Sequence, residues 1–211
     1  MAATSLDAIE REQLCDLFLQ LGPEAPTLCD GWSTLDLAAH LVVRETDPRA
    51  GPAILGGDRF AELEQRLMDR ARSRGLDALV ERLRGGPPLV PWRIPGLRGL
   101  LNLNEWFVHH EDVRRANGQE PRVDVAVLEA ELWASLGRAR FMVRGLKDAG
   151  LELVAAGYGT RTVRNREPKA TVQGGPQELV LFLSGRRDAA EVGVTGDDEA
   201  KAALAAARLG F

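Results

Sequence analysis

The stretch that organises this chain reads Asn104-Glu105-Trp106-Phe107-Val108-His109-His110-Glu111-Asp112. It holds two of the three histidines of the protein, and the third is His40. Glu105 and His109 are four residues apart, a spacing that stacks two side chains on one face of a helix, and Asp112 continues that face. Carboxylate oxygens and imidazole nitrogens are donors that suit zinc and other divalent ions. The stretch therefore predicts half of a metal site, carried on a helix.

The other half of such a site must come from elsewhere in the fold, and His40 is the only remaining imidazole. We therefore predict that His40, Glu105 and His109 bind one metal ion. His110 is not in this set, because neighbouring side chains on a helix point ~100° apart and only His109 shares a face with Glu105. A second interpretation stays open, in which the histidines are hydrogen-bonded core or solvated residues. The apolar residues around the pair favour burial, and a metal ion would satisfy several buried polar groups at once.

The composition bounds the class of protein. The chain has 211 residues, of which 45% are hydrophobic and 27% are charged, as in a globular protein with one large or two small domains. No apolar run approaches the ~20 residues of a membrane helix, and the start lacks the basic and apolar regions of a signal peptide. The net charge of -4 gives no electrostatic case for nucleic acid. We expect neither a membrane nor a nucleic acid as a partner.

Two cysteines, Cys15 and Cys29, are too few for a disulfide framework. Cys15 falls in a helical pattern and is expected to be a small buried hydrophobe. Cys29 lies just before a helix, and a reactive thiol is one interpretation of it. The scarcity of cysteine and the lack of an export signal favour a cytoplasmic location.

Helical periodicity predicts helices over residues 6–21, 34–44, 58–83 and 97–116. Ser33 and Asp36 form the pattern of a capping box at the start of the second helix. Gly75 is expected to bend or interrupt the third helix, and residues 90–95 are expected to be extended and either to form a lid or to pack over an end of the bundle. Four helices with short or moderate loops predict a four-helix bundle. A fifth helix is predicted over residues 123–146.

After Gly150 the hydrophobic pattern changes to a period of two, which predicts strands over residues 151–156, 160–164, 170–173 and 191–195. Helical segments are expected over residues 177–183 and from 197 to about 209. We therefore predict an α+β protein. Residues 1–147 would form a metal-binding helical bundle with a linking helix, and residues 148–211 a small C-terminal α/β domain.

Three motifs together resemble one family. Residues 30–41, with a Gly-Trp-Ser start and an Ala-His-Leu segment, resemble the second helix of DinB-like proteins and mycothiol-dependent maleylpyruvate isomerases. Residues 105–112 look like the glutamate-histidine motif of that family. Residues 174–186, followed by 194–197, resemble its appended small domain. The resemblance covers nearly the whole chain.

The resemblance implies a DinB-like bundle in which His40, Glu105 and His109 hold a divalent metal, usually zinc, with water completing the shell. It also implies mycothiol as a thiol cofactor near the metal. Arg186 falls on a Gly-Arg pattern beside the active site and is the candidate catalytic residue, holding a carboxylate of substrate or cofactor. Its alternative is a contact with the end of the preceding helix. The second histidine, His110, departs from the family pattern, so the reaction need not be maleylpyruvate isomerisation.

We therefore expect a metal- and thiol-dependent transferase or isomerase, active on a small molecule, as a monomer or homodimer. Glu111 or Asp112 would orient a ligand histidine. A non-catalytic metal-binding or small-ligand-binding protein is the alternative, and a structural bundle without metal is the third possibility.

Overall fold

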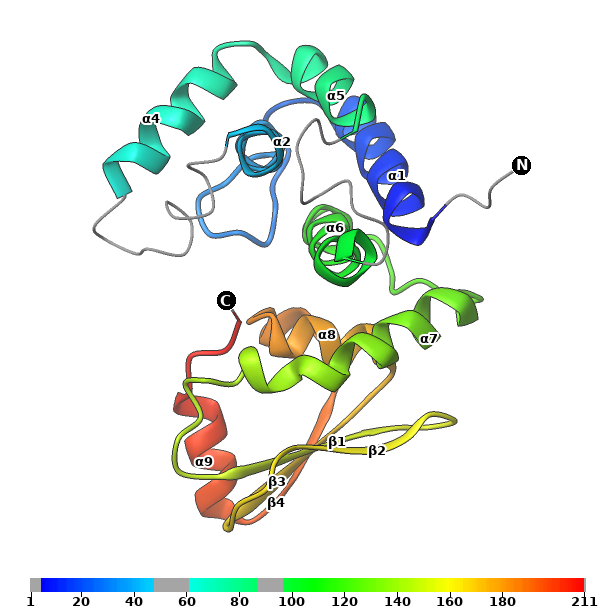
Figure 1. Cartoon of the computed structure of the whole chain (residues 1–211), viewed down its shortest axis with the longest axis vertical. Helices are drawn as coiled ribbons and strands as arrows, with labels where there is room; N and C mark the ends of the chain where they lie inside the picture. Colours follow the sequence, from blue (N-terminus) through cyan, green and yellow to red (C-terminus); the bar gives the residue numbers. More distant parts are fainter. Residues whose placement is uncertain (1–4, 48–60, 87–96, 211) are drawn as a thin grey trace. The chain divides into compact units, whose positions relative to one another are not determined.

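The computed structural model describes residues 5–47, 61–86 and 97–210. The chain divides into two compact units, Met1–Pro121 and Arg122–Phe211. The first unit is helical, and the second combines helices with a four-stranded sheet, which confirms the predicted α+β class (Figure 1). None of the helices in the described ranges is both long and apolar enough to cross a membrane.

The helices of the first unit follow the predicted periodicity. They are α1 Leu6–Leu21, α2 Thr34–Thr46, α4 Ala61–Arg72, α5 Leu76–Arg84 and α6 Leu97–Ala116. The predicted third helix is two helices, because Gly75 between them has φ +79°, a conformation that glycine adopts without strain. The expected start of that helix at residue 58 and the expected lid at 90–95 lie outside the described residues.

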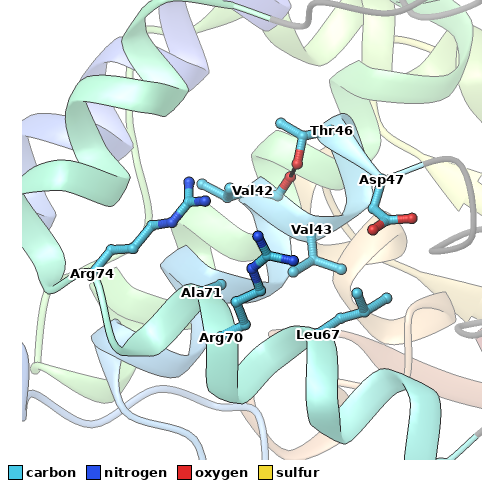
Figure 2. Close-up of a pocket in the computed structure, with 8 residues that line it drawn as sticks. All are labelled: Val42, Val43, Thr46, Asp47, Leu67, Arg70, Ala71 and Arg74. Atoms are coloured by element: carbon cyan, nitrogen blue, oxygen red, sulfur yellow. Dashed lines mark hydrogen bonds between the residues drawn. The ribbon is translucent and has the colours of Figure 1, made fainter.

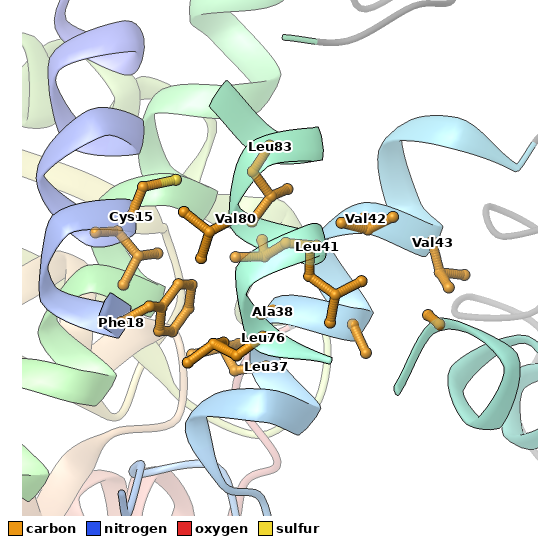
Figure 3. Packing of buried hydrophobic residues seen from close by; sticks show 14 of the residues in the cluster. Cys15, Phe18, Leu37, Ala38, Leu41, Val42, Val43, Leu76, Val80 and Leu83 are labelled. Carbon is orange, nitrogen blue, oxygen red and sulfur yellow. The ribbon is translucent and has the colours of Figure 1, made fainter. Parts of the chain in front are cut away.

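An apolar core joins these helices. The helix α1 packs against α5 and α6, and α2 packs against α4 and α5. Figure 3 shows the packing between α1, α2 and α5, with Phe18, Leu41 and Val80 among the buried side chains. Each such side chain stabilises the fold by about 1.5–3 kcal/mol when fully buried.

The helix α6 is buried on every side from Trp106 to Val113. A helix without an exposed face is a central element rather than a surface one. The polar residues in this stretch, both histidines among them, must therefore find their partners inside the protein.

The second unit is built on a mixed sheet. Its strands are β1 Gly150–Ala155, β2 Gly159–Arg164, β3 Lys169–Gln173 and β4 Gly193–Gly196, in the order β2-β1-β3-β4. The strand β1 is antiparallel to β2 and parallel to β3, and β3 is antiparallel to β4. The helices α8 Pro176–Leu183 and α9 Asp198–Ala206 complete the predicted pattern, and α9 packs against β3 and β4.

The predicted fifth helix is shorter than expected. It consists of α7 Ala126–Ser135 and the 3-10 helix η2 Leu136–Phe141. The end of the chain lies against the residues that come after η2. Gly210 N donates to Met142 O at 2.9 Å, and a Cβ on Gly145 would be 2.2 Å from the Arg208 carbonyl oxygen. Since α7 packs against α8, it belongs to the second unit, and the division falls after Pro121 rather than at the expected 147/148.

Candidate metal centre

His40 is positioned by the start of α2. Ser33 N donates to Asp36 Oδ2 at 2.9 Å, and Asp36 N donates to Ser33 Oγ at 3.4 Å, which forms the predicted capping box. Asp36 also accepts from Arg72 of α4. These contacts fix where α2 begins and therefore which way His40, one turn after Asp36, points.

The three predicted ligands lie together. Glu105 Oε1 is 3.7 Å from His40 Nε2 and 3.4 Å from His109 Nε2. One donor atom from each of the three residues lies within 4.8 Å of the other two. The His40 and His109 rings have centroids 5.5 Å apart and meet edge to face.

The spacing of these atoms suits a small divalent cation. With bonds of about 2.0–2.2 Å to nitrogen and oxygen, the separations of 3.7 Å and 3.4 Å correspond to ligand–metal–ligand angles of about 125° and about 110°, close to tetrahedral. Two imidazoles and one carboxylate are a ligand set of catalytic zinc sites, in which a further position stays open. Both contacts of Glu105 with the histidines therefore fit a zinc-sized ion.

Charges around the cluster favour an ionised carboxylate. Arg44 Nε lies 3.1 Å from Glu105 Oε1. Burial raises the pKa of Glu105, but the charge of Arg44 and hydrogen bonds from His109 and His40 outweigh burial and hold the pKa well below its usual range. A negative charge is therefore already present where a cation would bind.

The two histidines of the cluster differ in protonation. Burial lowers the pKa of His40, which favours the neutral ring that a metal requires. Burial also lowers the pKa of His109, but hydrogen bonds with Asp112, Cys29 and Glu105 outweigh burial and raise it well above its usual value. Binding of a cation at His109 Nε2 must therefore displace a proton.

Asp112 orients His109. His109 Nδ1 lies 2.9 Å from Asp112 Oδ2, and Asp112 is fully buried. Because a carboxylate accepts, Nδ1 carries the proton and Nε2 faces Glu105, an arrangement typical of metal-binding histidines. Glu111, the other candidate, is buried and instead accepts from Arg115 Nε at 2.8 Å. Of the two expected orienting residues, Asp112 alone contacts His109 in this way.

His110 faces another part of the protein. Its Nδ1 lies 2.9 Å from Glu10 Oε2 of α1, and both side chains are buried. This separation agrees with the expectation that His109 and His110 point in different directions.

The sequence interpretation named Cys29 only as a candidate reactive thiol and did not assign Trp32 or Arg44 to the site. Cys29 Sγ donates to Asp112 Oδ2 at 3.2 Å and lies 4.0 Å from His109 Nδ1. The Trp32 ring has its centroid 5.1 Å from that of His40. Arg44, which contacts Glu105, could have been found from the sequence, because it is four residues after His40 and therefore on the same face of α2.

Two cavities lined by described residues flank α2. The larger, of about 470 Å³, is lined by Asp30, Gly31, Trp32, Asp36, Gln65, Met68 and Arg72. Its volume falls in the range of small-molecule sites, and Trp32 joins it to His40. Figure 2 shows the smaller cavity, of about 110 Å³, in which Arg70 of α4 and Arg74 of the turn after it lie near Val42 and Val43 of α2. The larger cavity is the better candidate for a substrate.

Arg186 lies in the second unit, just after α8. Its Nη1 donates to Ser184 O at 2.7 Å, a contact with the end of that helix. The contact agrees with the alternative interpretation of Arg186, and its catalytic role stays a prediction.

The chain was compared with known protein families, curated proteins and solved structures. No protein-family model, no curated protein and no solved structure matches this chain.

Proposed function

We propose that the protein is a divalent-metal enzyme, with zinc as the metal, that uses a small thiol to transfer or isomerise a small molecule. The observation that carries the proposal is the convergence of His40, Glu105 and His109, with Asp112 hydrogen-bonded behind His109. Structural zinc sites have four protein ligands, whereas three protein ligands leave a position for water or substrate. The donor set therefore favours chemistry over a structural ion.

A divalent cation bound there would supply Lewis acidity and lower the pKa of a thiol or water beside it. The chain's own residues would do the rest. Arg44 holds Glu105 ionised through its contact at 3.1 Å, and Asp112 fixes the His109 ring. The cavity beside Trp32 would receive the substrate, with Gln65 and Arg72 as polar groups at its wall.

The thiol is proposed from the resemblance to mycothiol-dependent isomerases, as is a DinB-like arrangement of the four-helix bundle. Mycothiol is the candidate cofactor in this reading. Arg186 would hold a carboxylate of the substrate or cofactor, because a guanidinium offers paired donors in a fixed fork. Arg186→Met should then weaken ligand binding and spare the metal. A fall in thermal stability with unchanged ligand affinity would instead favour the helix-end contact.

The experiment combines metal loading with thiol binding. Cobalt-substituted protein is titrated with mycothiol, and the visible spectrum should shift as sulfur joins the metal. Glu105→Gln should lose the metal and the shift together, whereas the matched control Glu111→Gln should keep both. A protein that holds cobalt tightly and shows no shift would favour the non-catalytic metal-binding alternative.

A further inference from the structure

We propose that Cys29, Asp112 and the Nδ1 atom of His109 form a second metal site, selective for thiophilic cations, on the opposite edge of the His109 ring. It goes beyond the proposed function and shares with it the His109 side chain and Asp112, which orients that side chain in the first site. The two sites would use the two nitrogens of one imidazole.

The distances suit a metal ion. Cys29 Sγ is 3.2 Å from Asp112 Oδ2 and 4.0 Å from His109 Nδ1, and Nδ1 is 2.9 Å from Oδ2. With bonds of about 2.0–2.3 Å, these separations correspond to ligand–metal–ligand angles between about 90° and about 135°. An ion would therefore sit to one side of the three atoms and keep room for another ligand.

The loop that carries Cys29 is fixed to α6. Leu28 N donates to Asp112 O at 3.1 Å, and Asn117 Nδ2 donates to Pro26 O at 3.0 Å. Within the loop, Cys29 N donates to Thr27 Oγ1 at 3.1 Å. Hydrogen bonds of the residues just before Cys29 thus hold the thiol beside Asp112, so that its position does not depend on a bound ion.

The ligands decide which ions bind. A thiolate prefers soft cations such as Cd²⁺, whereas the nitrogen and oxygen donors of His40 and Glu105 suit harder or borderline ions. Binding of Cd²⁺ here would release both the proton of the Cys29 thiol and the proton on Nδ1 of His109, and bonds to the cation would replace the hydrogen bonds of these two groups to Asp112. The proton of the neutral His109 ring then lies on Nε2, where Glu105 can accept it.

The two sites are therefore filled one at a time. A neutral imidazole carries one proton, and an ion on either nitrogen leaves that proton on the other. The identity of the metal, thiophilic or not, would select which side of His109 is occupied.

The test is a Cd²⁺ titration of the metal-free protein, followed by the ultraviolet absorption of a cadmium–thiolate bond. The band should saturate at one equivalent, vanish in Cys29→Ser and persist in His40→Ala, which removes the other site. Cys15→Ser is the matched control and should keep the band, because Cys15 is fully buried and burial raises its pKa to about 12.

Alkylation of the folded protein gives a second readout that needs no variant. Cys29 is half-buried and Cys15 is inaccessible, so iodoacetamide should modify Cys29 and abolish the band. A band that survives in Cys29→Ser, or no band in the unmodified protein, overturns the second site. Neither result bears on the site at His40, whose failure shows instead as zinc binding that is unchanged when His40→Ala is added to Cys29→Ser protein.

Discussion

His109 and His110 are neighbours on α6 and are almost equally buried, at 8% and 5% exposed, yet their surroundings differ. His109 lies among donor atoms from three segments: Glu105 on its own helix, His40 on α2 and Cys29 in the preceding loop. His110 lies against the Glu10 carboxylate of α1.

The comparison shows that burial and residue type do not by themselves make a metal site. A buried imidazole bonded to one carboxylate is a satisfied core group, and His110 fits that description. His109 has metal-ligand atoms near both of its ring nitrogens, more than a single hydrogen-bonded core histidine needs. The number of such atoms around the ring therefore distinguishes His109 from His110.

The largest effect should separate the two histidines directly. His109→Gln should weaken zinc binding by more than ~100-fold, because it removes a ligand, whereas His110→Gln should change the affinity by less than ~3-fold. Calorimetric titration of the metal-free proteins measures both. Equal losses, or a larger loss at His110, would reject the assignment.

The acidic residues beside the histidines offer a second contrast. Asp112→Asn should weaken zinc binding by about 10–100-fold, because the His109 ring loses its orienting carboxylate. Glu111→Gln is the matched control, since Glu111 is equally buried but pairs with Arg115. It should leave zinc affinity unchanged, and a loss of affinity as large as that of Asp112→Asn would contradict the role of Asp112.

Removing the Glu10 carboxylate, which contacts His110, should affect the stability of the fold and not zinc binding. Glu10→Ala leaves a buried imidazole without this carboxylate and should lower the free energy of unfolding by about 1–3 kcal/mol. Urea unfolding in the presence of a chelator measures the loss. Zinc affinity should be unchanged, and a tenfold drop in it would mean that the two faces of α6 are coupled.

The smallest effect concerns the start of α2, which places His40. Burial raises the pKa of Asp36, but hydrogen bonds from Ser33 and then Arg72 outweigh burial and hold it below its ordinary 3.8. A carboxyl group with a lowered pKa stabilises the fold above its ordinary pKa and loses that contribution as the pH falls through the lowered value. Asp36→Ala should therefore cost about 1 kcal/mol at neutral pH.

The difference between wild type and Asp36→Ala should shrink as the pH falls below 3.8. Urea unfolding of the metal-free proteins across this range checks the sign. A difference that is independent of pH would show that the charge of Asp36 contributes nothing.

Much of this site follows from local sequence. The spacing from Glu105 to His109 and on to Asp112 fixes one helix face, and the capping box at Ser33 fixes the start of α2. These signals act within one turn, where helical geometry decides the outcome.

The rest depends on contacts between distant segments. Cys29 and Asp112 are 83 residues apart in sequence, and their meeting depends on the bond from Leu28 N to Asp112 O. The residues after the shortened helix predicted over 123–146 likewise contact Gly210 and Arg208 at the end of the chain. The periodicity of hydrophobic residues along the sequence does not predict such contacts.

The most direct test of the central claim is a zinc titration of Cys29→Ser protein, with and without the further change His40→Ala. The first change removes the thiol, so of the two donor clusters found among the described residues only that of His40, Glu105 and His109 stays intact. We expect one equivalent of zinc for Cys29→Ser and none of comparable affinity once His40 is replaced. Unchanged zinc binding in the double variant would contradict it.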